Sequence, residues 1–241
     1  MQKFYNYTLV EDIAEVVIPE CAGKTAVVNC LNPHSFVTAL DDAVFRYALE
    51  KSDFLLPDGE GVCIVTKKYK GIDLQKIAGD DIHHCLLKEV AKKSGKVFYM
   101  GSTERVLNLI EQRIKKEYPS ITVRTLSPSF CDELSEDESM RIVDEVNEFE
   151  PDVMFVSMTA PKQEKWVERY RRHLKGVKMI ASIGAVFDFY ACTVRRAPKW
   201  MIQMKIEWLY RFLNEPLRMW KRVFVSTPRF LRYTRKMKVE I

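Results

Sequence analysis

Polar side chains that could take part in chemistry recur where short apolar runs end. Asn32 follows the first of these runs, Asp58 the second, and Gln163 and Asp188 two later ones. If the runs are parallel strands, their carboxyl ends meet at one edge of a sheet, where α/β proteins bind their ligands. A carboxylate in such a partly dry crevice becomes a general base when its pKa is raised toward neutrality. We therefore predict that Asp58 is a catalytic base, although Asp58 and Asn32 could instead serve only as helix caps.

Glycines lie next to some of these polar residues, and another polar residue lies at the start of a predicted helix. Gly59 and Gly61 follow the candidate base and would let the backbone approach a ligand, and Gly101 ends another apolar run, where it could cradle a diphosphate. Gln163 lies in the first turn of a helix predicted to begin at Pro161, so free backbone N–H groups would face an anion there. A well-capped helix with a solvated first turn explains the same pattern about equally well.

Neither a metal site nor a disulfide framework is predicted. His83 and His84 are adjacent, and neighbouring side chains on a helix point about 100° apart, so one ion could not easily use both. No Gly-x-Gly-x-x-Gly or Gly-x-x-x-x-Gly-Lys-Ser/Thr motif occurs, which disfavours dinucleotide and P-loop nucleotide sites. The cysteines lack Cys-x-x-Cys spacing, which indicates reduced thiols in a cytoplasmic protein. They are Cys21, Cys30, Cys63, Cys85, Cys131 and Cys192.

Apolar runs alternate with amphipathic stretches through most of the chain. Strands are predicted at 24–29, 54–56, 97–100, 121–126, 153–157 and 177–183. Helices are predicted at 33–50, 59–70, 80–93, 103–117, 135–149 and from 161 onward, with Ser135 and Glu138 forming a capping box. This alternation predicts a Rossmann-like α/β fold, a mostly parallel sheet with helices on both faces. Three further helices at 198–213, 217–226 and 229–238, separated at Pro216 and Pro228, are predicted to form a C-terminal helical basic appendage.

Charge divides the 241-residue chain into two unequal parts. Residues 195–241 carry 13 Lys and Arg against 3 Asp and Glu, a net charge of +10, and contain three of the four tryptophans. The other 194 residues have 25 basic and 30 acidic side chains, a net charge of −5. We therefore divide the chain into an α/β core at 1–194 and a basic aromatic appendage at 195–241 that faces an anionic partner. No apolar run approaches about 18 residues and no signal peptide is indicated, so we expect no transmembrane helix.

Seven motifs in a fixed order resemble one protein family. They are Leu31-Asn32-Pro33, Pro57-Asp58-Gly59-Glu60-Gly61, Ile77-Ala78-Gly79-Asp80-Asp81, Ala160-Pro161-Lys162-Gln163-Glu164, Ile183-Gly184-Ala185-Val186-Phe187-Asp188, Arg196-Ala197-Pro198-Lys199-Trp200 and Glu207-Trp208-Leu209-Tyr210-Arg211. Over about residues 24–222, the chain resembles the WecG/TagA/CpsF family of bacterial glycosyltransferases. Three of the motifs together, Pro-Lys-Gln-Glu, Arg-Ala-Pro-Lys-Trp and Glu-Trp-Leu-Tyr-Arg, are specific, whereas any one alone is not.

The resemblance implies an inverting glycosyltransferase that needs no metal or other cofactor. Family members move a sugar, often of N-acetylmannosamine type, from a UDP-sugar to a sugar linked to polyprenyl diphosphate in the synthesis of cell-surface polysaccharide. By this resemblance Asp58 is the base, and Asn32 and Gln163 line the pocket. Asp188 would lie near the nucleotide, and Gly184 is also predicted to bind substrate. The resemblance also implies a peripheral location on the inner, cytoplasmic face of the cell membrane.

Some positions depart from the family pattern and bear on which sugar is donated. Cys30 stands where a threonine is usual, and Lys76 where an arginine is usual, which matters if that cation grips a diphosphate bidentately. Both are still predicted to bind substrate. The glycine before Pro-Lys-Gln-Glu is replaced within 158–160, and the usual Ala-Gly after Phe-Asp is Ala191-Cys192.

The basic tail is predicted to close over the site at the membrane. Arg195, Arg211, Arg218 and Arg222 are candidates for contact with the acceptor diphosphate or with lipid, and Arg218 and Arg222 share one helix face. The predicted partners are a UDP-sugar, a polyprenyl-diphosphate-linked acceptor and the cytoplasmic membrane surface, with no nucleic acid; a homo-oligomer is compatible with the sequence. The main alternative is a nucleic-acid-binding or modifying protein whose tail contacts phosphates. A third is a nucleotide-binding regulator without chemistry.

Overall fold

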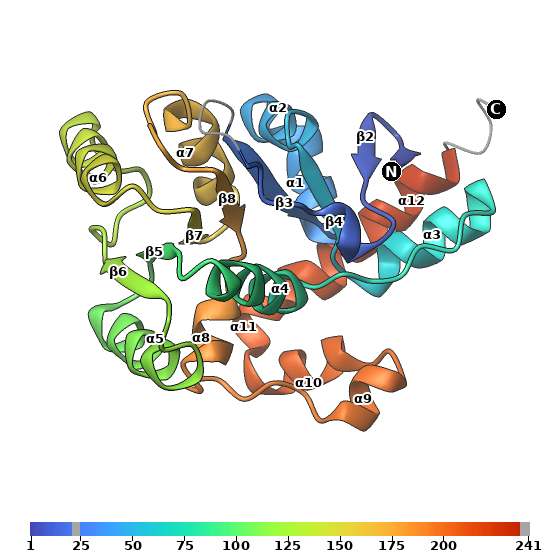
Figure 1. The fold of residues 1–241 in the computed structure, drawn as a ribbon. Helices are drawn as coiled ribbons and strands as arrows, with labels where there is room; N and C mark the ends of the chain where they lie inside the picture. Colours follow the sequence, from blue (N-terminus) through green and yellow to red (C-terminus); the bar gives the residue numbers. More distant parts are fainter. Residues whose placement is uncertain (21–24, 237–241) are drawn as a thin grey trace.

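A single eight-stranded sheet forms the centre of the molecule (Figure 1), in a computed structural model that describes residues 1–20 and 25–236. In sheet order the strands are β1 (Gln2–Phe4), β2 (Tyr7–Leu9), β4 (Phe54–Pro57), β3 (Ala26–Leu31), β8 (Met179–Ser182), β7 (Val153–Ser157), β5 (Lys96–Gly101) and β6 (Thr122–Leu126). β1 is antiparallel to β2 at one edge, and every other neighbouring pair is parallel. The predicted Rossmann-like, mostly parallel sheet is therefore confirmed.

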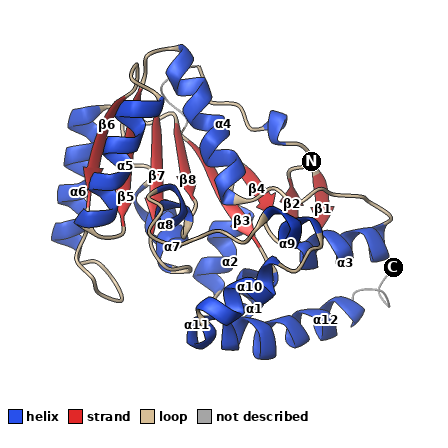
Figure 2. Cartoon of the chain, turned by 90° about the horizontal axis from the view of Figure 1, so that it is seen from below, coloured by secondary structure: helices blue, strands red, loops and turns tan. Residues whose placement is uncertain are grey.

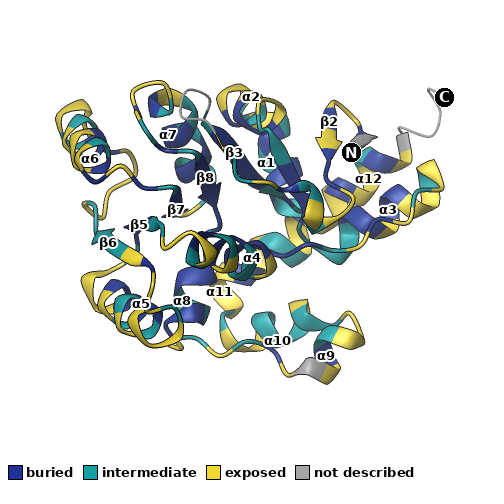
Figure 3. Cartoon of the chain, viewed as in Figure 1, coloured by how far each residue is buried: buried dark blue, intermediate teal, exposed yellow. Residues whose placement is uncertain are grey.

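Helices cover both faces of this sheet, and the central strands are buried, whereas the edge strand β6 is partly exposed (Figure 3). Val28, Tyr99 and Phe155 pack on one face against α4 (Gly79–Lys92), α5 (Glu104–Glu117) and α8 (Val186–Tyr190). The alternate residues Val27 and Phe98 pack on the other face against α6 (Glu136–Phe149) and α7 (Lys162–Tyr170). α1 (Pro33–Asp41) and α2 (Ala43–Glu50) extend this second layer over β3 and β4.

The remaining helices surround one end and one edge of the sheet. They are a 3₁₀ turn (Ile13–Glu15), α3 (Glu60–Lys70), α9 (Lys199–Gln203), α10 (Glu207–Asn214), α11 (Pro216–Trp220), a π-helical turn (Lys221–Ser226) and α12 (Thr227–Lys236). α8 follows directly after β8, and α9 and α10 lie below α8 in Figure 1, on the side of the strands' carboxyl ends. Figure 2 shows α11 and α12 along the same end of the molecule. The predicted C-terminal helical region is therefore present.

Several predicted boundaries were wrong for local reasons. The helix predicted at 33–50 is two helices, because Asp42 leaves helical geometry and its carboxylate accepts the Phe45 N–H as the cap of α2. The helix predicted at 198–213 is also two, α9 and α10. The predicted capping box is half formed, since Ser135 caps α6 but the Glu138 carboxylate accepts the Ser129 N–H instead. The sequence analysis did not anticipate β1, β2 or α8.

Pro228 does not separate the last two helices as predicted. α11, the π-helical turn and α12 follow one another without a break from Pro216 to Lys236. The wider turn carries a hydrogen bond from the Thr227 N–H to the Arg222 carbonyl oxygen, and Pro228 then falls in the first turn of α12. Pro228 has no N–H to continue the hydrogen-bond pattern, and it is tolerated because it directly follows the wider π-helical turn. Residues 237–241, the end of the helix predicted at 229–238, lie outside the described residues.

α12 is packed into the body of the protein. The Phe230 ring is fully buried, with its centroid 5.3 Å from that of Phe36 in α1. Ser226 Oγ and His34 Nδ1 share a hydrogen bond of 2.8 Å, and Arg229 pairs with Asp41. The C-terminal helices are thus fixed on α1 at the end of the sheet where α1 begins.

Other features of the described residues can be stated briefly. Cys30, Cys63, Cys85, Cys131 and Cys192 form no disulfide, and Cys21 lies outside the described residues. Within 1–20 and 25–236, no three His, Cys, Asp or Glu side chains are grouped so that they could hold a metal ion. None of the helices in that part of the chain has the length and apolar character needed to cross a membrane.

Removing the buried ring of Phe230 should destabilise the fold. We expect Phe230→Ala to lower the free energy of unfolding by about 3–5 kcal/mol, the usual cost of emptying an aromatic core position. The adjacent Leu231, which is 41% exposed, provides the control, since Leu231→Ala should cost less than about 1 kcal/mol. Urea unfolding followed by circular dichroism measures both, and equal losses would mean that α12 does not contribute to the core.

Candidate active site

The turn after β4 places Asp58 against the start of α1. The Asp58 backbone N–H donates to the carbonyl oxygen of Leu31 at 2.9 Å, and β3 and β4 are paired in parallel up to Leu31 and Pro57. Gly59 has a φ of +126°, and a Cβ there would lie 3.5 Å from the Cβ of Asn32. The ends of two adjacent strands thus hold Asn32 and Asp58 side by side.

The surroundings of Asp58 favour its protonated form more than water does. Burial raises the pKa of the Asp58 carboxyl, and the negative charge of Glu207 acts in the same direction. The positive charges of Lys76, Arg211 and Arg222 oppose this rise. A carboxylate with a raised pKa accepts a proton more readily, so Asp58 has the setting of a general base with cations close by.

Asn32 has a structural role as the cap of α1. Its Oδ1 accepts the backbone N–H groups of His34 and Ser35, each at 3.0 Å. The capping interpretation therefore holds for this oxygen. The Asn32 Nδ2 makes no hydrogen bond to any residue within 1–20 and 25–236, so it is available to a ligand beside the candidate base.

Gln163 lies against the turn that follows β8. Its Oε1 accepts the Met158 N–H at 3.2 Å, and its Nε2 donates to Glu164 Oε1 at 2.8 Å. A Cβ at Gly184 would lie 3.9 Å from Gln163 Oε1, and Ser157 Oγ donates to the Gly184 carbonyl oxygen at 2.6 Å. The structure therefore brings Gln163 and Gly184 together at the ends of β7 and β8. Both ends of the amide are fixed, and one of its N–H groups is left for a ligand.

Glu164 is a buried acid that the sequence analysis did not single out. The residue is 3% exposed, and its Oε2 has no hydrogen-bond partner among the described residues. Burial raises the pKa of Glu164 to about 7, against the opposing effect of its hydrogen bond from Gln163. The available signal was its position in a polar first turn directly after a strand, since a buried polar group costs stability unless it is used.

Cys30 contributes a neutral group at the end of β3. Burial raises the pKa of its thiol well above the ordinary value, and the charges of Asp58 and Glu164 add to this. The thiol therefore stays protonated. Where the family usually has a threonine hydroxyl, this chain offers a weaker hydrogen-bonding group.

A backbone hydrogen bond of the next residue and an ion pair of its own side chain hold Lys76 beside the end of β4. The N–H of the next residue, Ile77, donates to the Pro57 carbonyl oxygen at 3.1 Å. Lys76 Nζ lies 2.7 Å from Glu207 Oε2, and Arg211 Nη2 lies 3.2 Å from Glu207 Oε1. One carboxylate of α10 thus pairs with two cations, Lys76 beside the end of β4 and Arg211 on the same helix.

Arg222, in the π-helical turn, is a half-buried cation near the candidate base. No carboxylate in the described part of the chain forms an ion pair with it, whereas Arg218 pairs with Glu215 at 2.8 Å. Burial lowers the pKa of Arg222, and repulsion from Arg218 and Arg211 lowers it further, against the charge of Asp58. A half-buried guanidinium without an acidic partner is suited to binding an anionic ligand bidentately.

Asp188 and Arg195 lie further along the chain, near the C-terminal helices. The Asp188 carbonyl oxygen accepts the Thr193 hydroxyl at 3.1 Å. Burial raises the pKa of the Asp188 carboxyl, and the charge of Arg218 opposes this. Arg195 is exposed beside a small hollow formed with α10 and makes no ion pair within the described residues.

Gly101 has a structural explanation independent of any ligand. Its φ is +125°, and a Cβ there would lie only 2.0 Å from the Ser157 carbonyl oxygen. The close contact between β5 and β7 therefore requires a glycine. Three strands separate β5 from β4, so the structure does not bring Gly101 next to Asp58.

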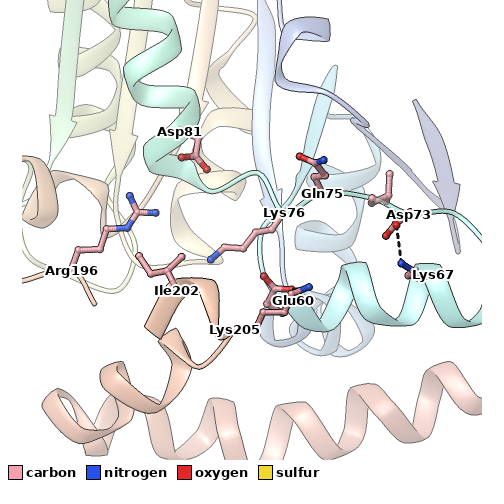
Figure 4. A pocket seen from close by; sticks show the side chains of 10 residues that line it. Glu60, Lys67, Asp73, Gln75, Lys76, Asp81, Arg196, Ile202 and Lys205 are labelled. Carbon is pink, nitrogen blue, oxygen red and sulfur yellow. Dashed lines mark hydrogen bonds and ion pairs between the residues drawn. The ribbon is translucent and has the colours of Figure 1, made fainter. Parts of the chain in front are cut away.

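A cleft of about 590 Å³ opens beside Lys76, between α3, residues 73–76, the start of α4 and the α9 region (Figure 4). Lys76 projects between Arg196 on one side and Glu60 on the other. Each cation of the wall has an acidic partner; the pairs are Lys67–Asp73, Lys76–Glu207, Arg196–Asp80 and Lys205–Glu60. The walls are therefore polar and balanced in charge while the cleft is empty.

The buried Glu164 should make stability depend on pH. An unfolded glutamate loses its proton near pH 4.5, whereas folded Glu164 keeps it until about pH 7, so the folded state binds more protons in this window and stability falls as pH rises. Between pH 5 and pH 8 the unfolding free energy of the wild type should fall more than that of Glu164→Gln, by on the order of 2–3 kcal/mol. Urea unfolding at both pH values measures this, with Glu148→Gln on the exposed side of α6 as the control. Parallel pH profiles for wild type and Glu164→Gln would refute the assignment.

Comparison with known proteins shows the family to which the chain belongs. The model of the glycosyl transferase WecG/TagA/CpsF family matches residues 3–240. The chain is 32% identical over 205 residues to the N-acetylglucosaminyldiphosphoundecaprenol N-acetyl-beta-D-mannosaminyltransferase of Bacillus subtilis, covering 85% of this chain and 77% of that protein. It is 26% identical over 249 residues to the protein of the same name from Staphylococcus aureus, covering 99% and 91%. The chain belongs to the WecG/TagA/CpsF family of glycosyltransferases.

Proposed function

We propose that this protein transfers a sugar from a UDP-sugar to a sugar linked to polyprenyl diphosphate, with inversion at the anomeric carbon. The observation that carries the proposal is the setting of Asp58. It is a partly buried carboxyl with a raised pKa, and the half-buried cations Lys76 and Arg222 are close enough to oppose that rise. A base surrounded by cations serves a reaction in which a hydroxyl loses a proton while a diphosphate leaves.

The proposed reaction is a single displacement. Asp58 accepts the proton of the acceptor hydroxyl as its oxygen forms a bond to the anomeric carbon of the donor sugar. The bond from that carbon to the UDP oxygen breaks on the opposite side, which inverts the configuration. Negative charge gathers on the departing diphosphate, where Arg222 and Lys76 stabilise it without a metal ion.

The donor is proposed to bind at the ends of β7 and β8. There the Gln163 amide, fixed by Glu164 and the Met158 N–H, offers one N–H group to the ligand beside Gly184. The relatives' names specify an N-acetylmannosaminyl donor group and an N-acetylglucosamine acceptor on a diphosphate lipid. We propose the same type of transfer here, in the synthesis of a cell-surface polysaccharide.

A lipid-linked acceptor requires the protein to meet a membrane, and we propose that the C-terminal helices do so on the cytoplasmic face. Apolar side chains are exposed along this region, with Leu217 94% exposed. The others include Trp200, Met204, Trp208, Leu213, Trp220, Phe224 and Val225. Aromatic and aliphatic side chains next to arginines are typical of surfaces that rest on lipid headgroups.

The ion pairs formed by the tail's basic residues disfavour the nucleic-acid alternative. A phosphate-binding surface needs basic side chains that are free to contact a backbone. Here five of the tail's 13 basic residues are bound to acids within the protein, which leaves fewer of them free for a nucleic-acid backbone. The pairs are Arg196–Asp80, Lys205–Glu60, Arg211–Glu207, Arg218–Glu215 and Arg229–Asp41.

Asp58→Asn should remove the base without changing the shape of the site. Sugar transfer to a lipid-linked acceptor should fall by roughly two orders of magnitude or more, while UDP affinity changes little. Asp144→Asn, on the exposed face of α6, provides the matched control and should transfer sugar at the wild-type rate. Transfer rates and UDP binding by calorimetry are the two measurements. Near-normal transfer by Asp58→Asn would exclude Asp58 as the base.

Sugar transfer should survive chelation of divalent ions. If Arg222, Lys76 and helix N-termini stabilise the leaving diphosphate, wild-type rates in excess EDTA should stay within about twofold of the untreated rate. These rates are compared with the transfer rate of the same enzyme in the presence of added magnesium and manganese. Loss of transfer in EDTA, with recovery on adding either ion, would contradict the proposed stabilisation by protein cations.

A further inference from the structure

Among the described residues, Glu207 is the one acid that contacts two of the cations assigned to the site. Its Oε2 lies 2.7 Å from Lys76 Nζ, and its Oε1 lies 3.2 Å from Arg211 Nη2. Both carboxylate oxygens are therefore occupied, and the carboxylate side chain is only 14% exposed. A phosphate group would use the same two donors, because Lys and Arg donors bind carboxylate and phosphate oxygens alike.

The charge on Glu207 is maintained by these contacts. Burial alone would raise the pKa of its carboxyl, but the hydrogen bond from Lys76 and the charges of Lys76, Arg211 and Arg196 outweigh burial and lower it. Glu207 is thus an anion at neutral pH. Its charge also reaches Asp58, since it contributes to the raised pKa of that carboxyl.

The position of these contacts links α10 to the reaction centre. Lys76 is fixed next to the end of β4 by the hydrogen bond from Ile77 to Pro57, one residue before Asp58. Glu207 is the first residue of α10, and Arg211 lies one turn later on the same helix. The pair formed by Lys76 and Glu207 therefore joins α10 to the turn that carries the candidate base.

We propose that Glu207 is an internal counter-ion of the diphosphate site, holding Lys76 and Arg211 while the site is empty and releasing them to the diphosphate of a ligand. This inference rests on the proposed function. A ligand diphosphate competes with the Glu207 carboxylate for the same donors, so Glu207 lowers the affinity of the site. When UDP leaves, Glu207 re-forms both ion pairs and thereby favours product release. Arg222, which has no such acid within the described residues, keeps its full attraction for the ligand.

The test compares the affinities of Glu207→Gln and the wild type for inorganic pyrophosphate and UDP. The amide removes the negative charge but keeps the size of the side chain. We expect both ligands to bind Glu207→Gln roughly fivefold to tenfold more tightly, the scale of one partly buried ion pair. Titration calorimetry measures the dissociation constants, and circular dichroism establishes that each variant is folded.

Two further variants separate this role from a general effect of charge. Glu60 is partly buried, borders the same cleft as Lys76, and pairs with Lys205 rather than with a cation of the diphosphate site. Glu60→Gln removes the same charge close by and should change pyrophosphate affinity less than twofold. In a Lys76→Met background, the gain from Glu207→Gln should fall by at least half, because the two residues act as a pair.

The outcomes distinguish this inference from the proposed function. If the wild type transfers sugar but Glu207→Gln binds pyrophosphate no more tightly, Glu207 only anchors α10 and the inference is overturned. An equal gain in Glu60→Gln, or an undiminished gain in the Lys76→Met background, also overturns it. If the wild type transfers no sugar and binds neither UDP nor pyrophosphate, the proposed function fails, and the inference fails with it.

Discussion

Close contact of three segments at Gly61 sets the position of the groups around Asp58. A Cβ at Gly61 would lie 2.6 Å from Cγ of Pro33 and 3.8 Å from Cε1 of Phe230. The first turn of α3 and the start of α1 therefore meet without room for a side chain, and Phe230 of α12 lies in van der Waals distance of the same point. The base lies three residues before this contact, and Arg222 lies in the turn that leads into α12. The same packing thus holds a carboxyl from the core and a guanidinium from the C-terminal helices around one site.

Three carboxyl groups of the candidate site differ in pKa because their surroundings differ. Glu207 is paired with two cations, which lowers its pKa despite burial. Glu164 is buried and has no cation beside it in the described part of the chain, so its pKa rises to about 7. Asp58 lies between these cases, since burial raises its pKa while three cations oppose the rise. Separate pKa values for neighbouring acids allow separate roles. In our account Asp58 takes a proton, Glu207 balances charge, and Glu164 fixes an amide.

The sequence was sufficient to predict those features of the fold that short-range patterns determine. The alternation of apolar runs and amphipathic stretches predicted the sheet and its helices, and it placed Asn32 and Asp58 at the ends of the strands now seen to be neighbours. Contacts between distant residues were not predictable, because no local pattern records them. The pair of Lys76 and Glu207 spans 131 residues, and the burial of Phe230 depends on an α1 surface formed far earlier in the chain. The same limit explains why Pro228 was wrongly predicted to separate two helices. The proline is accommodated next to a π-helical turn, which helix propensities do not predict.

The central claim is that this site transfers a sugar to a lipid-linked acceptor. The most direct measurement incubates the purified protein, in EDTA, with a panel of UDP-sugars and a short-chain prenyl-diphosphate-linked N-acetylglucosamine, and determines the mass of the lipid product. Our account predicts that at least one UDP-N-acetylhexosamine yields a lipid heavier by one sugar residue, whose anomeric configuration is inverted relative to the donor. A lipid of unchanged mass with every donor, or release of free sugar alone, would contradict it.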